Sequence, residues 1–245
     1  MPLIGCDCKV CVSDNPKNKR TRVSVLVEIE GKKLLIDTSP DLRQQALANK
    51  FSTVDAILYT HAHADHAHGI DETRAFNVNS RKPLDCYGDA ETLSELGRKF
   101  DYAFKPPVPR LGWFRPALVA NIVEPGKKFQ AAGIEVMPFL QDHGVAGMTL
   151  GFRIGNFAYS TDLNSIPQES LAILRGLDTW VVDCLQYKPH PTHAHVELVI
   201  NWARMLSPRQ AILTHMSHNI EYETIKASLP PGMTPGYDGM VLEVR

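Results

Sequence analysis

The sequence predicts a mixed α/β fold, and three observations carry this prediction. The chain has 245 residues, of which 44% are hydrophobic, enough for one sizeable core. Short β-branched runs recur along the chain, with helical stretches between them. Polar side chains of ligand type follow several of these runs, as they do where α/β proteins bind ligands. We therefore expect residues 1–245 to form a single domain.

The first half is predicted to open with a hairpin. Residues 23–29 and 33–37 are β-branched and apolar, and Glu30-Gly31 between them is typical of a turn. Beyond the hairpin we expect strands at 54–60 and 84–87, helices at 40–50 and 90–104, and an irregular proline-rich stretch at 105–116. The insert 70–116 is the candidate wall of a substrate pocket.

The second half is predicted to be richer in strands. The expected strands are 134–139, 149–154, 157–160, 179–182, 210–214 and 240–244, and the expected helices are 167–175 and 196–205.

Charge and hydropathy narrow the classes of partner. The formal net charge is −1, so no broad basic field indicates bulk nucleic-acid or membrane binding. The sequence shows neither an apolar run of membrane-spanning length nor a charged-then-apolar leader at its start. We expect a cytoplasmic enzyme.

Three of the five cysteines are clustered at the start of the chain. Cys6, Cys8 and Cys11 lie within the loop 1–22, and this clustering favours metal binding over a disulfide framework. Cys86 and Cys184 stand alone beside apolar or aromatic residues, and we expect both to be buried fillers of the core.

The strongest signal follows the predicted strand 54–60. The segment His61-Ala62-His63-Ala64-Asp65-His66 places four ligand-type residues within six positions. Imidazole and carboxylate are good ligands for zinc, manganese or iron, and alternate residues can turn two imidazoles to one side. His68 falls outside this spacing, and Gly69 permits a sharp turn into the next element.

Three further candidates share a placement at the ends of predicted strands. His143 follows the strand 134–139, Asp162 follows 157–160, and His215 follows 210–214. Their common placement predicts that they converge on one edge of a sheet.

These motifs together resemble the metallo-β-lactamase superfamily. The resemblance covers nearly the whole chain and implies an αββα sandwich with a dinuclear metal site on one edge. It implies that His61, His63 and His143 hold one metal, that Asp65, His66 and His215 hold the other, and that Asp162 bridges them. Asp37 matches the acidic residue that supports the histidine loop in this superfamily.

The segment Cys6-Asp7-Cys8-Lys9-Val10-Cys11 is similar to the C-x-C-x-x-C site of the PhnP-like phosphodiesterases. That resemblance implies a structural zinc held by Cys6, Cys8, Cys11 and His218, and two active-site ions that are manganese or zinc in preference to iron. A homodimer is expected from the family. The chain departs from the family by lacking most of its first strand and glycine-rich turn, so we expect that strand to be missing.

The PhnP resemblance implies cleavage of a small, nucleotide-like phosphodiester, such as a cyclic ribose-linked one. In the expected mechanism, hydroxide bridging the metals attacks phosphorus, with Asp65 and His195 as the catalytic residues and His195 donating the proton. His193 and His190 are nearby alternatives to His195. Competing interpretations are a thioester or lactone hydrolase of the same fold, an RNA 3′-processing nuclease, and a metal-dependent binding or sensor module.

Overall fold

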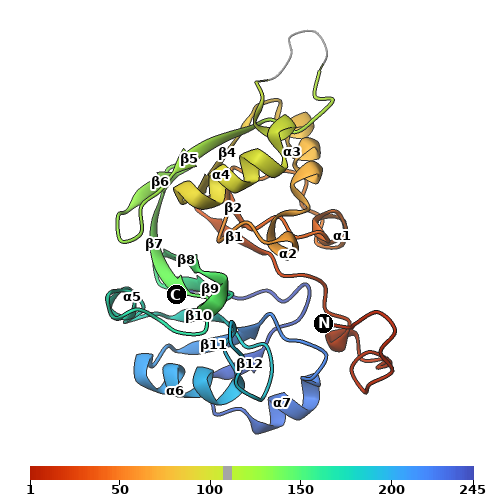
Figure 1. Ribbon diagram of the computed structural model, residues 1–245, viewed down its shortest axis with the longest axis vertical. Coiled ribbons are helices and arrows are strands. Elements are labelled where there is room, and N and C mark those ends of the chain that lie inside the picture. The colour runs from red at the N-terminus through yellow and green to blue at the C-terminus, as the bar shows by residue number, and fades with distance from the viewer. Residues whose placement is uncertain (107–111) are drawn as a thin grey trace. The chain divides into compact units, whose positions relative to one another are not determined.

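A computed structural model describes residues 1–106 and 112–245, and the chain divides into two compact units. Unit 1 combines residues 1–21 with residues 137–245, and unit 2 comprises residues 22–136. Each unit contains one sheet with helices beside it, and the predicted mixed α/β class with two sheets is confirmed (Figure 1). Part of the predicted irregular stretch, 107–111, lies outside the described residues.

Unit 2 is built on a five-stranded sheet in the order β1-β2-β3-β4-β5. The predicted hairpin is present, with antiparallel β1 and β2, and the remaining neighbours pair in parallel. The elements are β1 (Val25–Ile29), β2 (Lys32–Ile36), α1 (Leu42–Ala48), β3 (Ala56–Leu58), α2 (Ala64–Ala67), α3 (Thr73–Ser80), β4 (Leu84–Gly88), α4 (Ala90–Lys99) and β5 (Leu118–Ile122), with short 3-10 helices at Pro16–Asn18 of the other unit and at Ile70–Glu72 and Asp101–Phe104 here.

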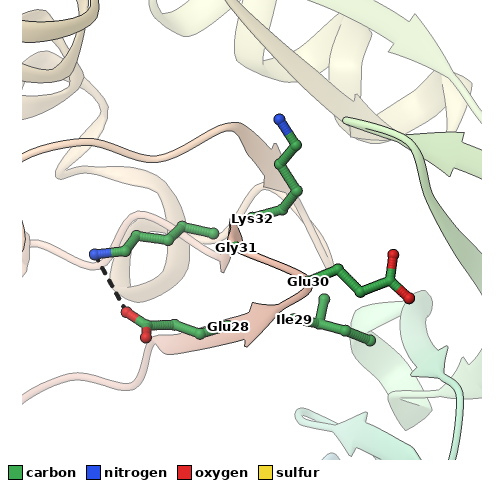
Figure 2. A pocket seen from close by; sticks show the side chains of 6 residues that line it. Glu28, Ile29, Glu30, Gly31 and Lys32 are labelled. Atoms are coloured by element: carbon green, nitrogen blue, oxygen red, sulfur yellow. Dashed lines mark ion pairs between the residues drawn. The ribbon is translucent and has the colours of Figure 1, made fainter.

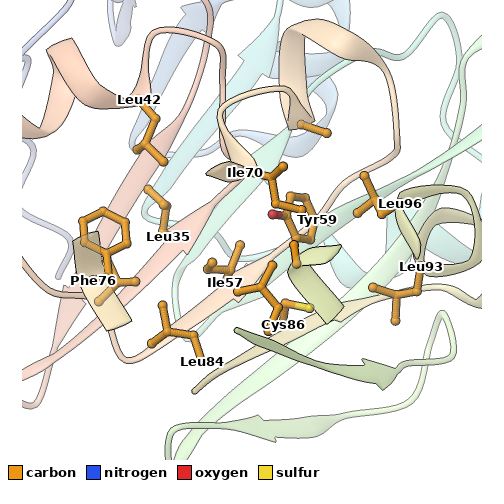
Figure 3. Close-up of a cluster of buried hydrophobic side chains, with 14 of the residues drawn as sticks. Leu35, Leu42, Ile57, Tyr59, Ile70, Phe76, Leu84, Cys86, Leu93 and Leu96 are labelled. Carbon is orange, nitrogen blue, oxygen red and sulfur yellow. The ribbon is translucent and has the colours of Figure 1, made fainter. Parts of the chain in front are cut away.

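Every residue of β3 is fully buried, as expected for a central strand of a parallel sheet with both faces covered. Figure 3 shows how Ile57 and Tyr59 meet Leu35, Cys86 and Leu96 in the core of unit 2. This burial fixes the strand, so the polar residues that follow Tyr59 emerge from a rigid support. Cys86 is buried, as predicted, and burial raises the pKa of its thiol to about 12.

The second sheet, whose strands belong mostly to unit 1, follows the order β12-β11-β10-β9-β8-β7-β6. Strand β8 pairs antiparallel with both β7 and β9, whereas β9, β10, β11 and β12 pair in parallel. The elements are β7 (Ile134–Asp142), a 3-10 helix (Gly144–Ala146), β8 (Met148–Ile154), β9 (Phe157–Ser160), α5 (Gln168–Ile173), β10 (Thr179–Asp183), α6 (Val196–Leu206), β11 (Gln210–Thr214), α7 (Tyr222–Ser228) and β12 (Met233–Pro235); β6 (Phe129–Ala131) pairs with the first residues of β7.

One predicted element is wrong. Residues 240–244 form no strand, and Val241 and Val244 are exposed; the last strand is β12, which pairs in parallel with β11. No ladder pairs the tail with another strand of the described residues, whereas β12 pairs with β11 despite containing Pro235. The proline is tolerated because β12 is an edge strand. Cys184 is buried in the core of unit 1, as predicted.

Two further facts bear on function. Among the helices of the described ranges, none combines the length and apolar character that a membrane span requires. The first strand of the structure begins at Val25, and residues 1–24 contain a 3-10 helix and turns.

Candidate metal centres

In unit 2, the histidine motif gathers three imidazoles just beyond β3. The ring centroid of His61 lies 4.4 Å from that of His63 and 4.4 Å from that of His66. His61 and His66 are buried, and His63 is exposed. The chain turns after His63, which caps α2, and the helix carries Asp65 and His66 in its first turn. This arrangement brings together the imidazoles that the sequence singled out.

The carboxylate of Asp37 orients one imidazole of this cluster, that of His66. It is fully buried directly after β2, and its Oδ2 lies 2.8 Å from His66 Nδ1. The Asp37 carboxylate also accepts hydrogen bonds from the backbone N–H and the hydroxyl of Thr60, at 2.9 and 2.8 Å. Burial raises the pKa of Asp37, and the hydrogen bond to His66 opposes that rise. With Nδ1 of His66 engaged by Asp37, Nε2 is the ring atom suited to a metal.

Asp65 and Gly69 complete the motif. The guanidinium of Arg22 lies 2.9 Å from Asp65 Oδ2, so a positive charge sits against this carboxylate. Gly69 has an ordinary φ of −84°, so the sharp turn expected there is not the reason for glycine. A Cβ at this position would lie 2.0 Å from the carbonyl oxygen of Ser39. Close backbone approach therefore requires glycine, and it packs the loop 37–41 against the motif.

In unit 1, three strand ends converge on one carboxylate. Asp162 Oδ2 lies 3.5 Å from His143 Nε2, and Asp162 Oδ1 lies 3.5 Å from His215 Nε2. The side chains of His143 and Asp162 are each 3% exposed, and that of His215 is 10% exposed, so the three are screened from bulk water. His143 Nδ1 lies 2.6 Å from the carbonyl oxygen of Thr192, which leaves Nε2 directed at Asp162.

The backbone of Asp162 itself has a left-handed conformation. Its φ is 53°, which is unfavourable for a residue other than glycine. The hydroxyl of Thr161 donates to Asp162 Oδ1 at 2.8 Å, and that of Thr149 donates to the Asp162 carbonyl at 3.0 Å. The buried Gln141 amide in turn donates to Thr149 Oγ1 at 3.2 Å. The Thr161 contact orients Oδ1, and the Thr149 contact holds the backbone carbonyl of Asp162.

Sequence reasoning missed Asp183 and ranked His193 second. His193 Nε2 lies 3.9 Å from Asp162 Oδ2, and its ring stacks on His215 with centroids 4.9 Å apart. His193 Nδ1 lies 2.9 Å from Oδ2 of the fully buried Asp183, whose Oδ1 lies 3.8 Å from His215 Nδ1. Asp183 ends β10, so the strand-end rule that found Asp162 would have found it too.

His195, the expected proton donor, immediately precedes α6. It caps the N-terminus of α6 in extended conformation, and its backbone forms a bridge with Gln186. Of the two neighbouring histidines, it is His193 that contacts Asp162 and His215. His190 packs against His193 with ring centroids 5.3 Å apart. His68, which falls outside the motif's spacing, is exposed and packs edge-on against Phe100.

The cysteine cluster of unit 1 forms a second centre. One ligand atom from each of Cys6, Cys8, Cys11 and His218 lies within 4.8 Å of the others. His218 Nδ1 is 3.4 Å from Cys6 Sγ and 3.5 Å from Cys8 Sγ. Ligands of a tetrahedral zinc ion lie roughly 3.5 Å apart, so this donor set fits zinc. The backbone N–H of Cys11 and the ring of His218 lower the pKa of Cys8 to about 6, which favours the thiolate that zinc requires.

The hollow shown in Figure 2 is lined by none of these donors. It has a volume of about 180 Å³ and is lined by Glu28–Lys33 at the β1–β2 hairpin. Lys33 Nζ pairs with Glu28 Oε1 at 3.2 Å across it. None of its six lining residues comes from the predicted pocket wall 70–116, so the hollow indicates no substrate site.

Comparison with known proteins identifies relatives along the whole chain. The model of the β-lactamase superfamily domain matches residues 32–216. The octanoyltransferase of Porphyromonas gingivalis is 35% identical over 245 residues, covering 98% of this chain and 48% of that protein, so the chain spans about half of that relative. A solved diphosphatase of the PhnP family is 36% identical, with a TM-score of 0.89 over 98% of this chain and 90% of that one.

Other solved structures share the fold at lower identity. Zinc-bound PqqB from Methylobacterium extorquens is 20% identical, with a TM-score of 0.78 over 99% of this chain and 95% of that one. With the strand-end histidines and aspartates described above, these matches show that the chain belongs to the metallo-β-lactamase superfamily.

Proposed function

We propose that this metallo-β-lactamase-fold hydrolase uses two divalent metal ions to cleave a phosphodiester bond in a small, nucleotide-like molecule. The observation that carries the proposal is the geometry of Asp162. Each of its two oxygens lies 3.5 Å from the Nε2 atom of a different histidine. A carboxylate that faces two imidazoles in this way is suited to bridge two ions, each of which also takes one of the histidines.

The ligand assignment follows the donor chemistry of each unit. We assign His61, His63 and His143 to one ion, Asp65, His66 and His215 to the other, and Asp162 to both. Its support is that His66 and His143 each have Nδ1 engaged by an oxygen acceptor, at 2.8 and 2.6 Å. Such contacts fix the tautomer that binds metal through Nε2. Imidazole and carboxylate ligands favour manganese or zinc, while the Cys6, Cys8, Cys11 and His218 set is assigned a structural zinc.

When bound, two such ions supply a nucleophile at neutral pH and offset the negative charge of the phosphoryl oxygens. The chain's own contribution is the proton for the leaving oxygen. We assign this role to His193 instead of His195, because His193 contacts Asp162 and His215. The hydrogen bond between His193 Nδ1 and Asp183 fixes the orientation of the ring, which leaves Nε2 as the atom that donates the proton.

The substrate class is drawn from the relatives. The PhnP-family protein at 36% identity is a diphosphatase, so a diphosphate diester is a second phosphoryl substrate to be tested. The octanoyltransferase relative is about twice the length of this chain, and its name does not locate acyl transfer in the matching half. We rank thioester and lactone hydrolysis below phosphodiester cleavage because the cysteine centre is a feature of the phosphodiesterase branch.

The test is hydrolysis by metal-reconstituted protein of bis(p-nitrophenyl) phosphate, a cyclic ribose phosphate, a diphosphate diester, an octanoyl thioester and a lactone. Turnover of the phosphoryl substrates, abolished in Asp162→Asn together with loss of bound manganese, is the expected result. Activity confined to the thioester or the lactone would overturn the phosphodiesterase assignment. His193→Ala and His195→Ala form a matched pair, and only the first should abolish turnover of the cyclic phosphate while metal content is retained.

A further inference from the structure

The two metal centres of unit 1 are linked by one short turn. His215 follows β11 with a left-handed φ of 57°, and His218 comes three residues later. The N–H of Ile220 donates to the carbonyl of Ser217 at 3.2 Å, which closes a turn around His218. The N–H of Ser217 donates to the carbonyl of Leu185 at 2.9 Å. The turn Ser217–Ile220 therefore contains the zinc ligand His218 and fixes the direction in which the backbone continues from His215.

A buried arginine holds this turn. Arg20 is only 8% exposed, and its Nη2 donates to the carbonyl of Ile220 at 2.7 Å and to that of Ser217 at 3.1 Å. Its Nη1 donates to the carbonyl of Lys17 at 3.3 Å and to Asn18 Oδ1 at 3.4 Å. One guanidinium thus joins the N-terminal segment to both ends of the turn through backbone atoms.

The surroundings of Arg20 favour this buried charge. Burial lowers the pKa of the guanidinium, and the carboxylates of Asp238 and Glu221 oppose that shift, so the group stays charged at neutral pH. Asn18, which is fully buried, donates to Glu221 Oε1 at 2.8 Å and accepts from the N–H of Tyr222 at 2.9 Å. The segment around Arg20 is therefore anchored independently of the cysteines, and the clamp does not depend on a zinc ion.

We infer that Arg20 is a positioning residue for His215, acting through the Ser217–Ile220 turn, and that it sets the affinity of the active-site ion that His215 binds. The inference rests on the proposed function, because it takes His215 as a metal ligand. A ligand must be held within about 0.5 Å of its productive position. His215 also has a left-handed backbone, which persists only where its surroundings enforce it.

The test measures manganese binding to protein that has received one equivalent of zinc, enough for the cysteine centre alone, from the electron paramagnetic resonance signal of free Mn²⁺. Thiolate ligands select zinc over manganese, so the titration reports the histidine and aspartate centre. Arg20→Met and Arg20→Gln should weaken Mn²⁺ binding about 10- to 100-fold, the range typical for loss of a residue that orients a ligand. Arg20→Lys keeps the charge with a shorter reach and should weaken it less.

Arg153 offers a matched control in the same unit. Its Nη1 also donates to two backbone carbonyls, but these belong to Ile173, the last residue of α5, and to Arg175 just beyond it. Arg153→Met should lower the melting temperature and leave Mn²⁺ affinity unchanged. His215→Ala is the reference for full loss of the ligand. If His215→Ala binds Mn²⁺ like wild type, the ligand assignment of the proposed function is wrong.

If His215→Ala loses affinity and either neutral Arg20 variant binds Mn²⁺ like wild type, Arg20 is a structural clamp only and the inference is overturned. Should both neutral variants fail to fold, Arg20→Lys decides. Weakened Mn²⁺ binding in that variant supports the inference, and wild-type binding overturns it.

Discussion

Replacing Asp183 with asparagine should slow the reaction in proportion to how strongly the leaving group needs a proton. Asp183 is fully buried, and its Oδ2 accepts a 2.9 Å hydrogen bond from His193 Nδ1. A hydrogen bond to a charged group contributes roughly 1.5–3 kcal/mol. If that contribution falls on the protonated His193, the loss in kcat is about 10- to 150-fold, at roughly 1.4 kcal/mol per factor of ten.

The assay compares two phosphodiesters at saturating metal. A cyclic ribose phosphate expels an alkoxide, which needs a proton, whereas bis(p-nitrophenyl) phosphate expels a stable phenolate, which does not. Asp183→Asn should therefore slow the first by the full factor and the second by much less. The control is Asp178→Asn, just before the other end of β10, where the carboxylate pairs with Arg209 at the surface.

Equal losses on both substrates would refute this reasoning, because they would mean that Asp183 acts on metal binding or folding. Asp183 Oδ1 also lies 3.8 Å from His215 Nδ1, so metal content must be measured beside the rates. A normal rate on the cyclic phosphate would remove both Asp183 and His193 from the proton-transfer step.

Three further outcomes are expected. Gly69→Ala should destabilise the protein and weaken metal binding, because its Cβ would lie 2.0 Å from Ser39 O; a normal melting temperature and metal content would contradict the packing described. Ile57→Ala, in a fully buried strand, should cost about 2–5 kcal/mol of unfolding free energy in urea titrations. Hydrogen bonds from Asn18 and Thr224 lower the pKa of Glu221 from 4.5 to about 2, so its stabilising effect is present above pH 4.5 and lost as pH falls toward 2. The difference in urea midpoint between Glu221→Gln and wild type should accordingly shrink over that interval, and a difference independent of pH would show that the carboxylate charge is not involved.

The strands were predictable where local pattern and tertiary environment agree. The run that contains β3 is uniformly apolar because both faces of the strand are covered, and β11 was predicted to the residue. Strand β5 was missed because its exposed residues Val119 and Ile122 are apolar, so the run lacks the alternation of apolar and polar residues that indicates a half-buried strand. The prediction of a strand at 240–244 failed because no ladder pairs this run with another strand of the described residues.

The residues of the candidate site also differ in how well the sequence predicted them. The motif from His61 to His66 and the strand-end residues Asp162 and His215 were identified from the sequence, because spacing and strand position are local properties. The choice between His193 and His195 was not local. It depends on Asp183, which lies ten residues before His193 and meets it only because the chain after β10 folds back. Two histidines separated by one residue offer the same local pattern, and only the buried carboxylate distinguishes them.

In each unit, a buried carboxylate at the end of a strand orients an imidazole ring. In unit 2 the buried carboxylate of Asp37 follows β2 and engages Nδ1 of His66; in unit 1 that of Asp183 ends β10 and engages Nδ1 of His193. Burying a carboxylate destabilises the folded protein unless the group is hydrogen-bonded, so each of these carboxylates needs its histidine partner. Each carboxylate lies at the end of a strand in a sheet, which is a rigid support. Its hydrogen bond to Nδ1 fixes the histidine tautomer and directs Nε2 away from the carboxylate. Substituting either carboxylate should therefore perturb its own histidine first, with Asp37 affecting metal binding and Asp183 affecting proton transfer.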